Sequence, residues 1–175
     1  MMTHDFRLLV DGQLVPGAAT FGVINPATAE VFAQCPKADA ALLERAVGAA
    51  KRAFPGWSAT PIDERARLVG ALADALEART DEFARLLTTE QGKPLPQATY
   101  EIMGSVGSLR SFAAMRPETR VIRESAGGGR VMEVRRPLGV VAAIMPWNFP
   151  LLLLMNKLAP ELVSGNTIVA KPAPT

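Results

Sequence analysis

Two polar side chains follow apolar runs of strand length near the carboxyl end of the sequence. Asn148 comes just after the run 139–145, and Lys171 ends the run 167–171. If both runs are parallel strands, their carboxyl ends meet at one edge of a sheet, where such sheets bind ligands. A side-chain amide there suits a developing oxyanion, an interaction worth roughly 3–4 kcal/mol of barrier. A lysine there suits ribose hydroxyls or phosphate.

Each of these residues also has a purely structural interpretation. Asn148 lies in the turn Pro146-Trp-Asn-Phe-Pro150. An asparagine in a proline-rich turn commonly bonds its own backbone, and a lysine at a strand end is commonly only solvated. In favour of chemistry, Trp147 and Phe149 flank the asparagine, and we expect them to fix the backbone and exclude water from it.

These two residues need a scaffold, which the pattern from Leu138 onward predicts. The two apolar runs enclose an apolar stretch of helical length at 151–164, and Gly165 follows it as a C-terminal cap. Strand, helix and strand in this order predict a βαβ unit of a parallel sheet that is buried on both faces. The charged residues of this segment are only Lys157, Glu161 and Lys171.

That scarcity of charge has two consequences. Residues 138–155 carry no formal charge, but Pro146, Asn148 and Pro150 in their middle argue against a membrane span. A segment with so few charges must be covered on several sides. We therefore expect 138–175 to be only the first βαβ unit of a sheet that needs more strands.

Helices are expected before this unit from apolar residues at helical spacing and from residues typical of helix ends. Asp39 is expected to cap the first helix, which Pro55 and Gly56 end. Thr60 is expected to cap the second helix, with Pro61 as its first residue. We assign the apolar face of each helix to the core. The expected helices span residues 37–54, 61–76, 81–91 and 97–115.

Two hairpins are expected besides. Residues 6–15 form one around the turn Asp11-Gly12. Residues 119–124 and 130–136 form the other around Ser125-Ala-Gly-Gly-Gly129, which lacks the spacing of a phosphate-binding glycine loop. Arginine is frequent in these arms without interleaved aromatic residues, which favours a solvated strand face or a subunit contact over RNA binding.

The order and spacing of several motifs resemble the aldehyde dehydrogenase superfamily over nearly the whole chain. The most specific block is Met145-Pro-Trp-Asn-Phe-Pro-Leu151. The other motifs are Asn25-Pro-Ala-Thr28, Trp57, Gly92-Lys-Pro-Leu95, Arg136-Pro-Leu-Gly139, Lys157-Leu-Ala-Pro160, Gly165-Asn-Thr167 and Lys171-Pro-Ala173. The resemblance implies an α/β fold: the N-terminal part of an aldehyde-dehydrogenase-like fold, with hairpins and helices followed by the first βαβ unit of a Rossmann-like parallel sheet.

The resemblance implies an oxidoreductase that converts an aldehyde to a carboxylic acid with NAD or NADP. In that family a cysteine thiolate attacks the aldehyde, hydride leaves to the nicotinamide, and a glutamate acts as base in hydrolysis of the thioester. The oxyanion-binding asparagine corresponds to Asn148, and the adenosine-ribose lysine to Lys171. Pro174 stands where the family often has Glu or Ser, so the cofactor preference stays open. The implied cofactor-binding residues are Ile144, Pro146, Trp147, Lys171, Pro172, Ala173 and Pro174, and no metal site is implied.

The nucleophilic cysteine and the base glutamate of the family are implied to lie beyond residue 175. Cys35 precedes Pro36 and is expected to be a buried, inert thiol. We therefore expect the chain alone to be inactive. The resemblance divides it into an N-terminal helical and hairpin part of the cofactor-binding domain (1–118), an oligomerisation-type hairpin (119–137) and the first βαβ unit (138–175), and it implies a homo-oligomer with a small-molecule aldehyde as substrate.

Composition limits the other classes. The 175 residues are 49% hydrophobic and 21% charged, an ordinary globular composition that excludes a disordered or collagen-like chain. The net charge of +2 gives no argument for nucleic acid or a membrane surface as partner. A single cysteine excludes an internal disulfide framework, and the first residues lack a signal-peptide pattern, so we expect a cytoplasmic protein.

Other functions stay open at this point. A non-catalytic truncated homologue would act by associating with full-length subunits. A fragment of a CoA-acylating semialdehyde dehydrogenase would share these motifs and differ beyond residue 175. A simple α/β structural fragment would be poorly soluble, because two parallel strands alone leave apolar faces open to water.

Overall fold

The computed structural model describes residues 6–125 and 127–173 of the chain. Its helices are α1 (Ala40–Ala59), α2 (Ile62–Glu77), α3 (Thr80–Gln91), α4 (Leu95–Ala113) and α5 (Pro150–Ser164). Its strands are β1 (Leu8–Val10), β2 (Gln13–Val15), β3 (Ala19–Asn25), β4 (Glu30–Lys37), β5 (Arg120–Glu124), β6 (Arg130–Glu133), β7 (Val140–Ile144) and β8 (Thr167–Lys171).

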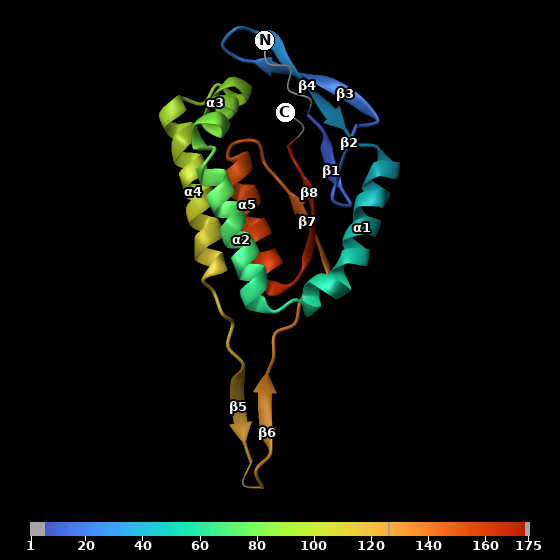
Figure 1. Ribbon diagram of the computed structural model, residues 1–175, viewed down its shortest axis with the longest axis vertical. Helices are drawn as coiled ribbons and strands as arrows, with labels where there is room; N and C mark the ends of the chain where they lie inside the picture. Colours follow the sequence, from blue (N-terminus) through green and yellow to red (C-terminus); the bar gives the residue numbers. More distant parts are fainter. Residues whose placement is uncertain (1–5, 126, 174–175) are drawn as a thin grey trace.

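The strands pair in twos, and the helices lie on both sides of the last pair. Strands β1–β2, β3–β4 and β5–β6 are antiparallel pairs, whereas β7 and β8 are parallel. Helices α2, α3, α4 and α5 lie on one side of β7 and β8, and α1 lies on the other (Figure 1). The hairpin β5–β6 projects from the far end of the body (Figure 1).

The expected βαβ unit is confirmed. Strand β7 runs into α5 and returns through β8, with Val140 opposite Thr167 at one end and Ile144 opposite Lys171 at the other. Gly165 ends α5 with a φ of 96°, a left-handed conformation that favours glycine. Residues 138–155 thus divide into a strand, a turn and a helix start. Among the described residues, no helix is long and apolar enough to cross a membrane.

The apolar faces of α2, α4 and α5 meet in one core. Val69 and Ala73 of α2 pack with Ile102 and Leu109 of α4 and with Ala159 of α5, and each of these side chains is almost fully buried. Burial of these faces against one another supplies the main stabilisation of amphipathic helices. This packing fixes α5, and with it the turn from β7 that precedes it.

The predicted end of the first helix is wrong. Asp39 caps α1 as expected, since its carboxylate accepts a hydrogen bond from Leu42 N–H at 2.8 Å. The helix then continues through Pro55 to Ala59. A proline removes one helical hydrogen bond but does not forbid the helix when other contacts hold the following turn. Here the Trp57 indole donates a hydrogen bond to the Leu162 carbonyl at 3.1 Å, and this contact holds the last turn of α1.

The predicted N-terminal cap of the second helix is also wrong, because α1 extends to Ala59, directly before Thr60. Thr60 closes α1, because its backbone N–H bonds the carbonyl of Gly56 and its hydroxyl donates to that same oxygen at 3.0 Å. Helix α2 starts at Ile62, with Pro61 before it as the capping residue and without a side-chain cap. Thr60 therefore ends one helix and does not begin the next.

Candidate functional site

The turn between β7 and α5 carries Asn148 at the carboxyl end of the parallel strands. Met145 extends the pairing beyond β7, since its N–H donates to the Lys171 carbonyl at 3.0 Å. Residues 146–149 then cross to α5, which Pro150 opens. Proline at a first helical position has a backbone already suited to the helix. The sequence therefore starts α5 directly after the turn that holds Asn148.

The side chain of Asn148 has no hydrogen-bond partner among the described residues, and it is exposed. The chain's other three asparagines each bond a neighbour: Asn25 accepts from Ala27, Asn156 from Ser108 and Asn166 from Gly139. The interpretation of Asn148 as a turn residue that bonds its own backbone is therefore not what the structure shows. Its amide is left available to a ligand.

The expectation that the flanking aromatic residues exclude water from Asn148 is wrong for this chain. Trp147 is 69% exposed and Phe149 is 38% exposed. The ring of Phe149 lies against the ammonium of Lys93, 4.2 Å from the ring centroid, and so packs toward the connection between α3 and α4. In the described part of the chain nothing covers the outer face of the turn, so the asparagine meets solvent.

The structure brings most of the predicted cofactor residues to one edge. Ile144 and Lys171 are register partners at the carboxyl ends of β7 and β8. Ile144 is 68% exposed. The other predicted residues on this edge are Pro146, Trp147 and Pro172, all exposed, and Ala173, which is half-buried. Pro174 lies outside the described residues.

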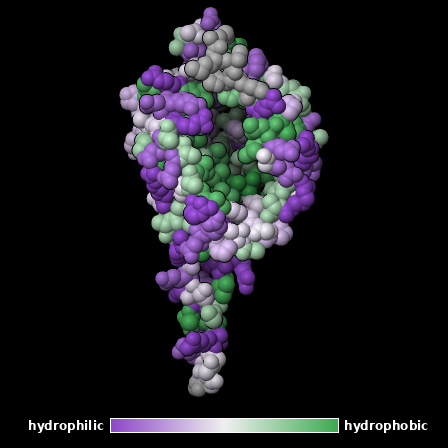
Figure 2. Space-filling view, viewed as in Figure 1, coloured by the Kyte–Doolittle hydropathy of each residue, from purple (hydrophilic) through white to green (hydrophobic). Residues whose placement is uncertain are grey.

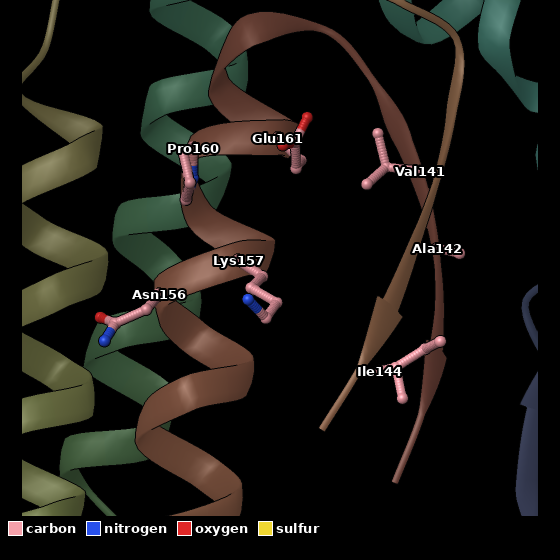
Figure 3. Close-up of a pocket in the computed structure, with 7 residues that line it drawn as sticks. All are labelled: Val141, Ala142, Ile144, Asn156, Lys157, Pro160 and Glu161. Atoms are coloured by element: carbon pink, nitrogen blue, oxygen red, sulfur yellow. The ribbon is translucent and has the colours of Figure 1, made fainter. Parts of the chain in front are cut away.

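An open hollow of about 430 Å³ lies between β7 and α5. Figure 3 shows Val141 and Ile144 on the strand, across from Lys157 and Glu161 on the helix. In the space-filling view, apolar surface gathers in the hollowed middle of the molecule (Figure 2). Among the described strands, β7 pairs only with β8, so its other edge is unpaired beside this hollow.

A second cavity of about 240 Å³ is mostly apolar and lies among α3, α4, α5 and the end of β8. Glu90 is its one acidic lining residue. The surrounding protein desolvates this carboxylate and raises its pKa, although part of the side chain reaches solvent. No group of described acidic, histidine and cysteine side chains is arranged to hold a metal ion.

Cys35 lies on β4 and is half-buried. Desolvation, and secondarily the negative charge of Glu90, raise the pKa of its thiol. A raised pKa leaves the sulfur protonated at neutral pH, and the protonated thiol is a poor nucleophile. The expectation of an unreactive thiol is supported, although the residue is less buried than we expected.

The sequence patterns did not identify Lys93 and Glu101 as residues of this site. Glu101 is fully buried on α4 and pairs with Lys93. The ammonium of Lys93 also donates to the Asn148 carbonyl at 2.8 Å. A signal existed in the sequence, because Glu101 is a carboxylate on the apolar face that Ala98 and Ile102 share.

The comparisons with known proteins all lead to one family. The model of the "Aldehyde dehydrogenase family" matches residues 14–175. The human protein "2-aminomuconic semialdehyde dehydrogenase" is 38% identical over 167 residues, which cover 94% of this chain and 34% of the relative. A "glutarate-semialdehyde dehydrogenase" of Pseudomonas aeruginosa is 40% identical over 182 residues, covering 99% of this chain and 38% of the relative. The chain thus spans about a third of the length of these relatives.

Solved structures agree with the sequence relatives. An "E. coli NADP dependent enzyme" superposes with a TM-score of 0.91 and 34% identity, over 95% of this chain and 36% of that one. The protein PnpE, solved "in complex with nicotinamide adenine dinucleotide", superposes with a TM-score of 0.88 and 38% identity, over 95% of this chain and 35% of that one. The described fold is therefore the N-terminal region of these structures.

Proposed function

Because the chain belongs to the aldehyde dehydrogenase family, we propose that it forms part of an enzyme that oxidises an aldehyde to a carboxylic acid with NAD or NADP. One observation carries the proposal beyond the family. The amide of Asn148 has no partner among the described residues and stands at the carboxyl ends of the parallel strands, on the same edge as Lys171. Ligands of such sheets bind at this edge.

The residues at this edge fit a dinucleotide. Ile144 and Trp147 offer exposed apolar surface for a base, and the ammonium of Lys171 is able to donate to ribose hydroxyls. Pro146, Pro172 and Ala173 continue the edge on either side. When bound, the nicotinamide accepts the hydride from the substrate. We leave the choice between NAD and NADP open, since the similar structures include an NADP-dependent enzyme and a complex with nicotinamide adenine dinucleotide.

In this proposal the amide of Asn148 donates a hydrogen bond to the aldehyde oxygen as negative charge develops there. Loss of one such donor lowers kcat by roughly 10²- to 10³-fold in other enzymes. The donor needs a fixed backbone, and here the turn is fixed from α5 on one side and from the paired strands on the other.

The nucleophile of the reaction is proposed to come from outside these 175 residues. Their one cysteine, Cys35, has a raised thiol pKa and lies on β4, in the hairpin with β3. The thiolate and the carboxylate base that the family resemblance implies would then be supplied by further sequence. Consistent with this, the chain spans about a third of the length of its relatives. We therefore propose that the chain alone does not turn over aldehydes.

The test measures NAD(P)H formation from a panel of aldehydes, with the 175-residue chain and with a longer protein that contains it. In the longer protein, Asn148→Ala should lower kcat by roughly 10²- to 10³-fold and leave cofactor affinity unchanged. Gln13→Ala is the matched control, since Gln13 is an exposed side-chain amide on the separate β1–β2 hairpin. An unchanged kcat for Asn148→Ala refutes the oxyanion role. Robust turnover by the short chain refutes the external nucleophile.

A further inference from the structure

The backbone around Asn148 is held by side chains from the end of α3, from the connection to α4 and from α4 itself. We propose that Lys93, with Glu101 and Gln91, positions Asn148 for catalysis, an inference that rests on the proposed function. The three side chains bind the turn from both sides of Asn148. None of them is placed to touch the substrate, so their role is that of positioning residues.

Glu101 holds the side of the turn toward α5. One oxygen of its carboxylate accepts hydrogen bonds from the N–H groups of Leu151 and Leu152, at 3.0 and 3.3 Å. These are N–H groups of the first turn of a helix, which lack partners within the helix. A negative charge at this end also interacts favourably with the helix dipole. Glu101 thereby fixes where α5 begins, two residues after Asn148.

Lys93 holds Asn148 itself. Its ammonium pairs with the other oxygen of Glu101, donates to the Asn148 carbonyl at 2.8 Å and lies 4.2 Å from the centre of the Phe149 ring. One ammonium therefore binds the backbone of Asn148, the side chain after it and the carboxylate that caps α5. We therefore expect a change at this ammonium to shift the asparagine.

Gln91 holds the side of the turn toward β7. Its side-chain N–H donates to the carbonyl of Trp147, the residue directly before Asn148. The consecutive carbonyls of Trp147 and Asn148 are thus both bound by residues near the end of α3. Because the Asn148 side chain has no partner among the described residues, its direction depends on this backbone.

Burial argues that the pair is more than a stabilising contact. The Glu101 side chain is fully buried and that of Lys93 is 14% exposed. A buried ion pair commonly gives no more stability than apolar residues of the same size, because desolvation of the charges opposes their attraction. The advantage of the Lys93–Glu101 pair is geometric, because its charged groups hold backbone atoms at defined positions. Small misplacements of a catalytic group cost up to roughly 100-fold in rate.

The test uses the enzyme that contains this chain and compares Lys93→Met with Asn148→Ala. Lys93→Met should lower kcat by about 10- to 100-fold without changing cofactor affinity. Lys93→Arg, which keeps the charge, should recover part of the loss. In the background of Asn148→Ala, Lys93→Met should cause little further loss, because Lys93 acts through Asn148. Lys51→Met, on the exposed face of α1, is the matched control and should keep the parental kcat.

A second measurement does not depend on activity. Hydrogen exchange at the amides of Leu151, Leu152 and Leu153, which are hydrogen-bonded at the start of α5, should become faster in Lys93→Met and stay unchanged in Lys51→Met. If Lys93→Met does not fold, Glu101→Gln replaces it, since glutamine keeps an acceptor for the helix N–H groups and loses the charge for Lys93. It should give a smaller change in the same direction in both readouts.

The outcomes separate this inference from the proposed function. If Asn148→Ala lowers kcat but Lys93→Met changes neither kcat nor exchange, the positioning role is overturned and the function stands. The same holds if the two losses in kcat simply multiply in the double variant. If Asn148→Ala leaves kcat unchanged, the oxyanion role fails. Faster exchange in Lys93→Met would then show a purely structural clamp, which overturns the inference as well.

Discussion

Glu101 and Arg65 bind opposite ends of the same helix. Glu101 accepts the N–H of Leu151 at 3.0 Å in the first turn of α5, and Arg65 donates from Nε to the carbonyl of Val163 at 3.0 Å in the last turn. Arg65 comes from α2 and Glu101 comes from α4, and both helices pack on α5. A negative group at the start and a positive group at the end both complement the helix dipole. The helix that begins beside Asn148 is thus held at both ends by buried charges.

Replacement of Arg65 should destabilise the fold. Arg65 is 7% exposed and also donates to the carbonyl of Thr60, so it connects the ends of α1 and α5. Arg65→Met leaves buried carbonyls without their donor, and each such loss costs about 1–3 kcal/mol. We expect the free energy of unfolding to fall by about 2–4 kcal/mol. Urea denaturation followed by circular dichroism measures it.

Arg67→Met is the matched control on the same helix. Among the residues that the structure describes, Arg67 pairs only with Glu64 one turn away, and its side chain is 63% exposed. Exposed pairs of this kind contribute about 0.5 kcal/mol or less. Equal losses for the two variants would contradict the role of Arg65 as the buried link between α1 and α5.

Replacement of Lys171 should weaken cofactor binding without changing the chemical step. Lys171 lies opposite Ile144 at the strand ends and is exposed, so its ammonium is free to reach a ribose. Lys171→Ala should raise the cofactor Kd about tenfold, the loss of one charged hydrogen bond, and leave kcat at saturating cofactor unchanged. Fluorescence titration measures the affinity. Lys37→Ala at the end of β4 is the control, and an equal effect there would rule out a specific contact.

The thiol of Cys35 should react slowly in the folded chain. Burial and the charge of Glu90 raise the pKa of this thiol. The reactive thiolate is therefore scarce until the pH rises above the pKa of an ordinary thiol. Alkylation by iodoacetamide should be several-fold slower in the folded chain than in the urea-unfolded chain. Glu90→Gln should accelerate the folded reaction, because it removes a negative charge. Equal rates in folded and unfolded chains would show that the thiol is not perturbed.

Glu90 should make stability fall as the pH rises. Burial raises its pKa in the folded state, so the folded chain holds this proton more tightly than the unfolded chain. The stabilisation is complete below the unfolded carboxyl pKa and is lost as the pH rises through the folded value. Glu90→Gln should therefore stabilise the chain at neutral pH by about 1 kcal/mol or less, given the exposure of the side chain, and not in acid. Urea titrations at both pH values measure this, and a pH-independent difference would contradict it.

Local patterns predicted the elements whose ends are set locally. The Asp39 cap, the Gly165 cap and the parallel strands around α5 all follow from neighbouring residues. The end of α1 at Pro55 was predicted wrongly, because the contact that holds the next turn joins Trp57 to a carbonyl 105 residues away. A contact between distant segments leaves no trace in local periodicity.

Some features of the candidate site follow from local patterns, and others depend on contacts between distant segments. The common edge of Asn148 and Lys171 follows from the rule that parallel strands place their carboxyl ends together. The exposure of Trp147 and the hydrogen bond from Lys93 to the Asn148 carbonyl depend on how α4 packs against the start of α5. Only the buried carboxylate of Glu101, placed among apolar neighbours, marks this packing in the sequence.

The hairpin β5–β6 is predicted to mediate contact with a second copy of the chain. It projects from the body (Figure 1), and an isolated two-stranded hairpin is only marginally stable in water. Its apolar side chains are nevertheless open to solvent, with Ile122 61% exposed and Met132 53% exposed. If a second copy covers them, Ile122→Asp should shift the sedimentation of the protein toward the monomer at equal concentration. Leu14→Asp is the control, since Leu14 is 65% exposed on the separate β1–β2 hairpin. A parental protein that sediments only as a monomer, or an equal shift for both variants, would contradict a contact through this hairpin.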